Sequence, residues 1–201
     1  MSGDSIRKLL LGLGALALLV GGAFYGCGPG SPRSIRSAFE GNLQGFLDIP
    51  DLEGFPVPDD VPGRDSLDDV RRLVQRNQLP LGYRRGRMLV LDRKAGKIDD
   101  LHFALPRDVR ARTPEEVGTV VWIDKERVLM GSYSGPPGTE GKGYSHEWYA
   151  TIIDYGEKQK VGLQDFHGSS PLGVKLGEGD RDGTEPSVYR MLEHFAKLPL
   201  R

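Results

Sequence analysis

Three side chains in the second half of the chain are of types that bind metal ions or transfer protons. Asp165 and His167 are two positions apart at the end of a β-rich run, and His146 begins another such run. Residues two apart in a strand point to the same face, so Asp165 and His167 could share a metal ion or act as an acid and its orienting partner. The short connection between the two runs predicts that His146 lies opposite His167 or nearly so. One hypothesis is therefore a metal-assisted hydrolase that uses His146, Asp165 and His167. The simpler interpretation is an exposed polar end of a β ribbon.

Other local motifs do not supply a cofactor site. The stretch GTEGKG at residues 138–143 lacks the leading glycine of a phosphate loop, because Pro136 stands there, and it ends in Gly143 where a hydroxyl residue is needed. Residues 178–189 resemble a calcium loop in part, but Tyr189 occupies the place of its bidentate glutamate. We therefore predict no cofactor. The formal net charge of −1 gives no case for nucleic-acid binding.

A long apolar segment near the start of the chain predicts contact with a membrane. Leu9 to Gly26 reads LLLGLGALALLVGGAFYG, eighteen uncharged residues that follow Arg7 and Lys8, and the only cysteine, Cys27, comes next. Eighteen helical residues span about 27 Å, close to the thickness of the hydrocarbon layer. We expect residues 9–27 to contact membrane lipid.

The basic start, the leucine-rich stretch and the cysteine together resemble the signal peptide of bacterial lipoproteins. In that family a leucine, a small residue, and a glycine or alanine precede a cysteine that is lipidated before cleavage on its amino side. The corresponding residues here are Phe24, Tyr25, Gly26 and Cys27, of which the last two match and the first two depart from the motif. The resemblance implies that Cys27 is the lipidation site and that the domain lies outside the cytoplasm.

Two alternatives to the lipid anchor stay open. In one, the segment remains as an uncleaved single-pass helix, whose orientation the flanking basic residues do not decide. In the other, an ordinary signal peptide is removed and the protein is released. A single cysteine cannot form an internal disulfide, and a thiol placed where lipidation would consume it favours the first interpretation.

Composition divides the rest of the chain. Residues 1–27 are the signal peptide or anchor, residues 28–65 a Pro/Gly-rich acidic tether, and residues 66–201 a single β-rich domain. Within the tether, residues 37–47 have the spacing of a short helix that docks on the domain or, as the alternative, on the membrane surface. Residues 63–112 carry thirteen basic and seven acidic residues. The simpler interpretation of this excess is a solvated surface, and the alternatives are that it lies against the acidic segment or contacts anionic lipid or polymer.

The domain is predicted to be α+β. A helix over residues 66–78 precedes the strands, and a helix that begins near Thr184 and ends before Pro199 follows them. The turns at residues 93–96, 125–126 and 156–159 are short enough for hairpins, which predicts mainly antiparallel pairing, with the C-terminal helix packed on one face of the sheet. The six predicted strands are 87–92, 97–103, 117–124, 127–134, 146–155 and 160–166.

The leading functional hypothesis is a membrane-tethered, non-enzymatic bacterial envelope protein. Two glycine-rich loops, residues 135–143 and 168–183, flank the same predicted hairpin, and aromatic residues lie beside them at Tyr133, Tyr144 and Trp148. Loops at one edge of a sheet often carry binding sites, and aromatic rings suit a polymer or a protein ligand. We therefore expect an envelope protein or polymer as the partner at these loops.

Overall fold

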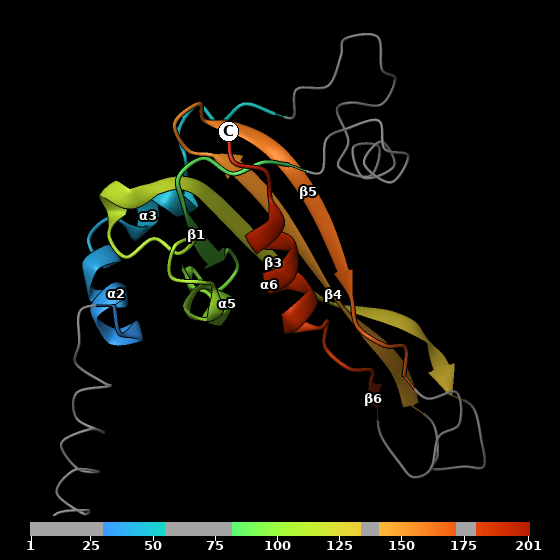
Figure 1. Ribbon diagram of the computed structural model, residues 1–201. Coiled ribbons are helices and arrows are strands. Elements are labelled where there is room, and N and C mark those ends of the chain that lie inside the picture. The colour runs from blue at the N-terminus through green and yellow to red at the C-terminus, as the bar shows by residue number, and fades with distance from the viewer. Residues whose placement is uncertain (1–29, 55–81, 134–140, 172–179) are drawn as a thin grey trace, which may run out of the picture.

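The computed structural model describes residues 30–54, 82–133, 141–171 and 180–201 (Figure 1). They form an α+β fold around a mixed, mostly antiparallel sheet of six strands, in the order β2-β1-β3-β4-β5 with β6 beside β4. Two pairings, β1 with β3 and β4 with β6, are parallel. The predicted fold class is therefore confirmed. The strands are β1 (Arg87–Asp92), β2 (Lys97–Ile98), β3 (Val117–Tyr133), β4 (Gly141–Asp154), β5 (Gln159–His167) and β6 (Arg181–Asp182).

Helices cover both faces of the sheet. Alternation along β1 sends Met88 and Val90 into one apolar cluster and Leu89 and Leu91 into the other, as the period of a strand requires. The first cluster is closed by α5 and α6, and the second by α2 and α3 (Figure 1). The helices are α2 (Pro32–Phe39), α3 (Leu43–Leu47), α5 (Asp100–Ala104) and α6 (Val188–Lys197), with a 3-10 turn η1 (Pro114–Glu116) before β3.

Residues 30–54 belong to the folded domain. The Ser31 side chain caps α2 by accepting from the Ser34 N–H, and Ile35 and Phe39 are buried in the second cluster. The indole Nε1 of Trp122 donates to the backbone oxygen of Phe46 in α3 at 2.8 Å. The expectation that residues 37–47 dock on the domain is therefore confirmed. The tether predicted for residues 28–65 is wrong for residues 30–54, because apolar side chains spaced for a helix face outweigh the local Pro and Gly content.

The longest strand replaces a predicted hairpin. A turn was expected at Lys125 and Glu126, but β3 continues through both, opposite Trp148 and Glu147 of β4. The ammonium of Lys125 contacts Asp99 at 2.6 Å, so this polar position is satisfied inside the strand. Because β3 does not fold back, its neighbour on the other side is β1, in parallel, after a crossover that contains β2, α5 and η1.

The predicted strand over residues 97–103 is also wrong beyond Ile98. The Asp99 side chain accepts from the Leu101 N–H at 2.9 Å and starts α5 as an N-cap. His102 consequently lies in a helix and is fully buried. The alternating apolar residues that suggested a strand instead face the two clusters from a single helical turn.

Two predicted hairpins and the last helix are confirmed, with changes in detail. β1 pairs with β2 and β4 with β5, both antiparallel. The C-terminal helix buries Met191 and Phe195, but Ser187 caps it rather than Thr184. Thr184 instead exchanges hydrogen bonds with Ser169. The helix predicted over residues 66–78 lies outside the described residues.

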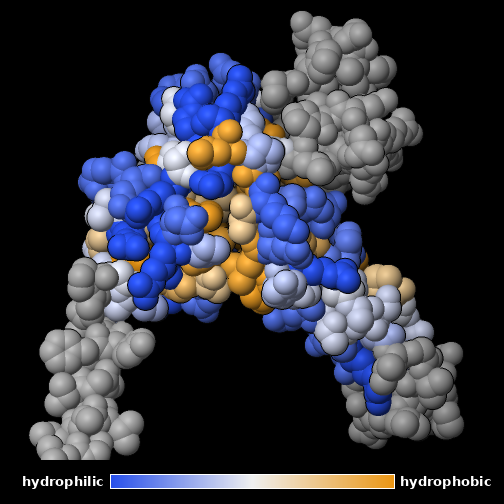
Figure 2. All heavy atoms as spheres, in the orientation of Figure 1, coloured by the Kyte–Doolittle hydropathy of each residue, from blue (hydrophilic) through white to orange (hydrophobic). Residues whose placement is uncertain are grey.

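Beyond the two clusters, β3 and β4 continue as a projecting ribbon, here called the arm (residues 125–133 and 141–148; Figures 1 and 2). The last cluster residues are Ile123 on β3 and Trp148 on β4, so the arm extends past the packed core. Its Leu129 and Met130 are 52% and 54% exposed. Exposed large apolar side chains on a projecting ribbon indicate a surface that a partner can cover.

In the four described ranges, every helix is too short or too polar to cross a bilayer. The apolar segment with Cys27 lies outside those ranges, so its membrane contact stays a prediction.

Candidate functional site

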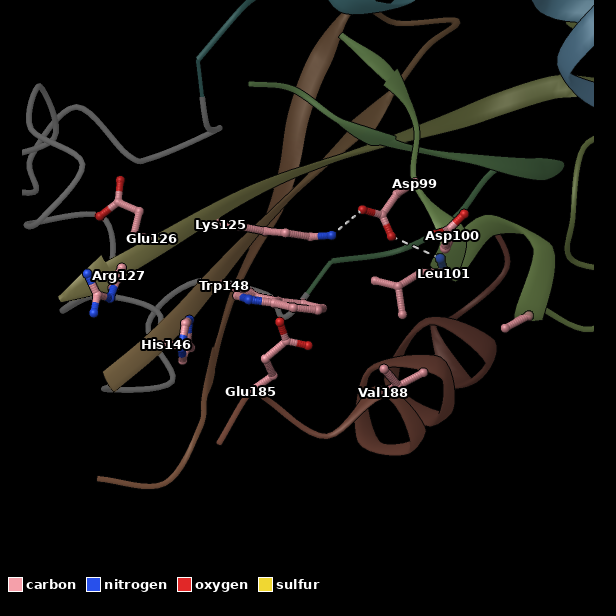
Figure 3. Close-up of a pocket in the computed structure, with 11 residues that line it drawn as sticks. Asp99, Asp100, Leu101, Lys125, Glu126, Arg127, His146, Trp148, Glu185 and Val188 are labelled. Atoms are coloured by element: carbon pink, nitrogen blue, oxygen red, sulfur yellow. Dashed lines mark hydrogen bonds and ion pairs between the residues drawn. The ribbon is translucent and has the colours of Figure 1, made fainter. Parts of the chain in front are cut away.

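A pocket of about 440 Å³ lies where the arm leaves the body of the domain (Figure 3). Its walls come from the start of α5, from β3 and β4, and from the start of α6. Charged groups of both signs surround an apolar floor. The lining residues are Asp99, Asp100, Leu101, Ala104, Lys125, Glu126, Arg127, His146, Trp148, Glu185 and Val188.

Lys125 forms an ion pair and a cation–π contact in this pocket. Its Nζ lies 2.6 Å from Oδ2 of Asp99 and 4.4 Å from the centre of the Trp148 ring. Asp99 is only 2% exposed, and its other oxygen is held by the Leu101 N–H. Each oxygen of the buried Asp99 carboxylate therefore has a donor, Lys125 on one side and the Leu101 N–H on the other. These two contacts connect β3 to the start of α5 in the pocket wall.

A second charged group lies further along the arm. The Nε of Arg127 contacts Oδ1 of Asp182 at 2.7 Å, and its guanidinium stacks 3.6 Å from the centre of the Tyr144 ring. His146 lies opposite Arg127, with its Nε2 3.9 Å from the same Asp182 oxygen. These contacts join β3, β4 and β6 on the α6 side of the sheet.

The three residues of the hydrolase hypothesis do not form one site. The register places Glu147 opposite His167 and Tyr149 opposite Asp165. His146 is one residue from Glu147, so it points to the other face of the sheet. His167 instead has its Nδ1 3.8 Å from Oε1 of Glu147. Among the described residues no three His, Cys, Asp or Glu side chains are grouped to hold a metal ion. The predicted joint site of His146, Asp165 and His167 is therefore wrong.

The described ends of the second glycine-rich loop pack tightly against each other. A β-carbon on Gly168 would lie 1.7 Å from the Thr184 backbone oxygen, and one on Gly183 would lie 1.8 Å from that of Ser169. Only glycine allows the two chain segments to approach this closely. Residues 134–140 and 172–179 lie outside the described residues, so ligand binding by the loops stays a prediction.

The outer edge of β3 along the arm is open. β1 pairs with β3 only as far as Asp92 opposite Ile123. From Asp124 to Tyr133, β3 pairs with β4 on one side, and within residues 30–54, 82–133, 141–171 and 180–201 no strand pairs with the other. An open edge offers a row of backbone N–H and C=O groups to an extended peptide.

Sequence reasoning pointed to His146 and Trp148 but missed Asp99, Lys125 and the open edge. Asp99 followed by a helical turn was a capping signal that the alternating pattern of residues 97–103 obscured. The sequence predicts a turn at Lys125, and a turn there would exclude both its ion pair and the continuous edge of β3. Comparison with models of protein families, with curated proteins and with solved structures found no match to this chain.

Proposed function

We propose that this chain is a membrane-tethered, non-enzymatic envelope protein that binds an extended segment of a partner protein along the open edge of β3. Its location would be outside the cytoplasm, with Cys27 as the lipidated residue. The residues of the apolar segment and its resemblance to a lipoprotein signal peptide support the anchor.

The open edge from Asp124 to Tyr133 is the observation that carries the binding proposal. Strand addition obtains affinity from main-chain hydrogen bonds and specificity from alternate side chains. Leu129 and Met130 are neighbours at a β-bulge, where no residue of β4 lies opposite Met130, and a segment added at this edge can cover both exposed apolar side chains. Val188, 44% exposed in the pocket wall, supplies another apolar contact at the base of the arm.

The anchor is tested by intact mass and membrane flotation of the chain expressed in a bacterium. A lipoprotein is expected to lose residues 1–26 and to gain acyl mass, and the Cys27→Ala variant is expected to keep its full length. An unlipidated full-length mass with unchanged flotation would instead mean a spanning helix.

The binding surface is tested by site-specific photo-crosslinking in the native membrane. A photoreactive residue at position 129 is expected to give one discrete adduct, which the additional change Met130→Asp removes. The matched control is the same photoreactive residue at Leu200, which is 67% exposed but lies away from the arm. Equal adducts from both positions, or an adduct at twice the mass of the chain, would contradict a distinct partner at the edge.

A further inference from the structure

Three arginines gather beside the point at which the described chain begins. Arg107, Arg110 and Arg112 lie on the segment between α5 and η1. A β-carbon on Gly30 would lie 3.9 Å from Cδ and 4.0 Å from Nε of Arg112. We call these three residues the arginine surface. It adjoins the start of α2.

The arginine surface has little internal charge compensation. Arg110 is only 8% exposed, and its Nη1 donates to the Phe103 backbone oxygen at 2.6 Å. The Nε atoms of Arg110 and Arg112 are both buried without a hydrogen-bond partner. Within the part of the chain that the structure describes, no carboxylate forms an ion pair with any of the three guanidinium groups. Buried cationic donors without a hydrogen-bond partner are groups that an anion can bind.

The pKa of Arg110 reflects both its burial and the neighbouring positive charges. Burial, and then repulsion from Arg112 and Arg107, lowers the pKa of Arg110. The positive charges of Arg107 and Arg112 therefore lie close enough to act on the Arg110 guanidinium. A bound anion would relieve this repulsion and use the forked donors of the guanidinium groups.

Further basic residues continue the arginine surface along α2. The guanidinium of Arg36 stacks 4.6 Å from the centre of the Phe103 ring, on the residue whose carbonyl holds Arg110. Arg33, Arg36 and Lys97 line a groove of about 760 Å³ between α2 and β2 together with Glu40, and Arg36 also pairs with Asp100 at 3.0 Å. Figure 2 shows mostly hydrophilic residues over this side of the molecule.

The sequence places this surface close to the anchor. Gly30 is three residues after Cys27, and three residues span at most about 11 Å. A domain held by Cys27 therefore keeps Arg112 within reach of the headgroup layer. Lipid phosphates are the anions concentrated at that depth.

We propose that Arg107, Arg110 and Arg112 bind the phosphate of an anionic phospholipid headgroup and so hold this face of the domain against the membrane. The proposal rests on the membrane tether proposed above, because it is the short distance to Cys27 that selects a lipid phosphate over other anions.

The test is calorimetric titration of the full chain in neutral detergent. The probes are short-chain phosphatidylglycerol, short-chain phosphatidylcholine and inorganic phosphate. The variant carries Arg107→Gln and Arg112→Gln, which leaves the Arg110 contact to Phe103 intact. The matched control carries Lys142→Gln and Arg190→Gln, the same charge change on the arm and on α6.

Phosphatidylglycerol is expected to bind the unmodified chain and the control with equal affinity, and more tightly than either other probe. The arginine variant is expected to bind it about thirtyfold more weakly, since each basic residue near an anionic surface contributes about fivefold. Equal affinity of variant and control would overturn the proposal. Inorganic phosphate binding as tightly as phosphatidylglycerol would overturn the choice of a lipid.

Failure of the tether is recognised separately. Flotation of the same preparation with neutral vesicles depends on residues 9–27 and not on the arginines. A chain that does not float contradicts the tether, whereas a chain that floats without headgroup preference contradicts only the arginine surface.

Discussion

Acidification is expected to destabilise the fold through one side chain, His102. Its ring is fully buried and connects three segments. Nδ1 accepts from the Val90 N–H of β1 at 3.4 Å, and Nε2 lies 3.0 Å from the Ala111 backbone oxygen. This arrangement requires a neutral ring with its proton on Nε2, because an imidazolium would turn a second donor toward the Val90 N–H.

The structure gives the sign and the size of the effect. Burial lowers the pKa of His102 to about 4, with a smaller contribution from Arg110, against the hydrogen bond to Ala111 that raises it. The ordinary value is 6.5, so the unfolded chain binds the proton first as the pH falls. Stability is therefore complete above about pH 6.5 and is lost progressively down to about pH 4. At about 1.4 kcal/mol per unit, the loss is about 3 kcal/mol.

The assay is urea unfolding, followed by tryptophan fluorescence, of the full chain in neutral detergent between about pH 7 and pH 4. The comparison variant is His102→Gln, which does not titrate and can still donate toward Ala111. Other ionisable groups, including His194, whose pKa burial also lowers, are present in both proteins and cancel in the difference.

The free energy of unfolding of the unmodified chain is expected to fall by about 3 kcal/mol more than that of the variant over this range. Parallel curves for the two proteins would refute the reasoning, because they would mean that the buried ring accepts a proton without cost.

Three further perturbations are expected to lower stability, each measured by urea or thermal unfolding. Asp154→Ala removes a buried carboxylate that accepts from the Tyr83 hydroxyl and from two N–H groups of the β4–β5 turn. The free energy of unfolding is therefore expected to fall by about 3 kcal/mol. An unchanged urea midpoint would contradict this role. Gly183→Ala is expected to lower the melting temperature clearly, while Gly131→Ala, with nothing within 4 Å of its new β-carbon, is the control and should change it little. Lys125→Met leaves Asp99 buried without its ammonium and is expected to cost about 2 kcal/mol at neutral pH, with recovery in Lys125→Arg; equal losses in both variants would argue against the ion pair.

Local turn chemistry explains which elements the sequence predicts well. The Asp92 side chain accepts from the Ala95 N–H, and Asp154 does the same for Gly156, so each hairpin carries its own turn signal. The α6 pattern is likewise local, since Met191 and Phe195 are one turn apart on one face.

Long-range contacts explain what the sequence does not predict. Whether Lys125 sits in a turn or a strand depends on Asp99 and Trp148, which only the fold brings to it. The hydrolase hypothesis fails by a single position of register, because Glu147 rather than His146 lies opposite His167. Counting back from the turn would place His146 opposite His167, but a β-bulge at Val161 shifts the pairing by one residue, and such a shift moves a side chain to the other face of a sheet.

The docking of α2 and α3 also changes how the proposed anchor would operate. A free tether over residues 28–65 would let the domain move within a radius of about 35 Å of the anchor. Because residues 30–54 belong to the folded domain, at most residues 28 and 29 would separate Cys27 from it. If the proposed anchor holds the chain at Cys27, the height of the domain above the bilayer would then vary over a much narrower range than with a free tether. A partner in the same membrane would meet the arm by diffusion in two dimensions, which would raise the effective concentration of the partner. Partners whose binding segment lies at another height above the lipid would be excluded.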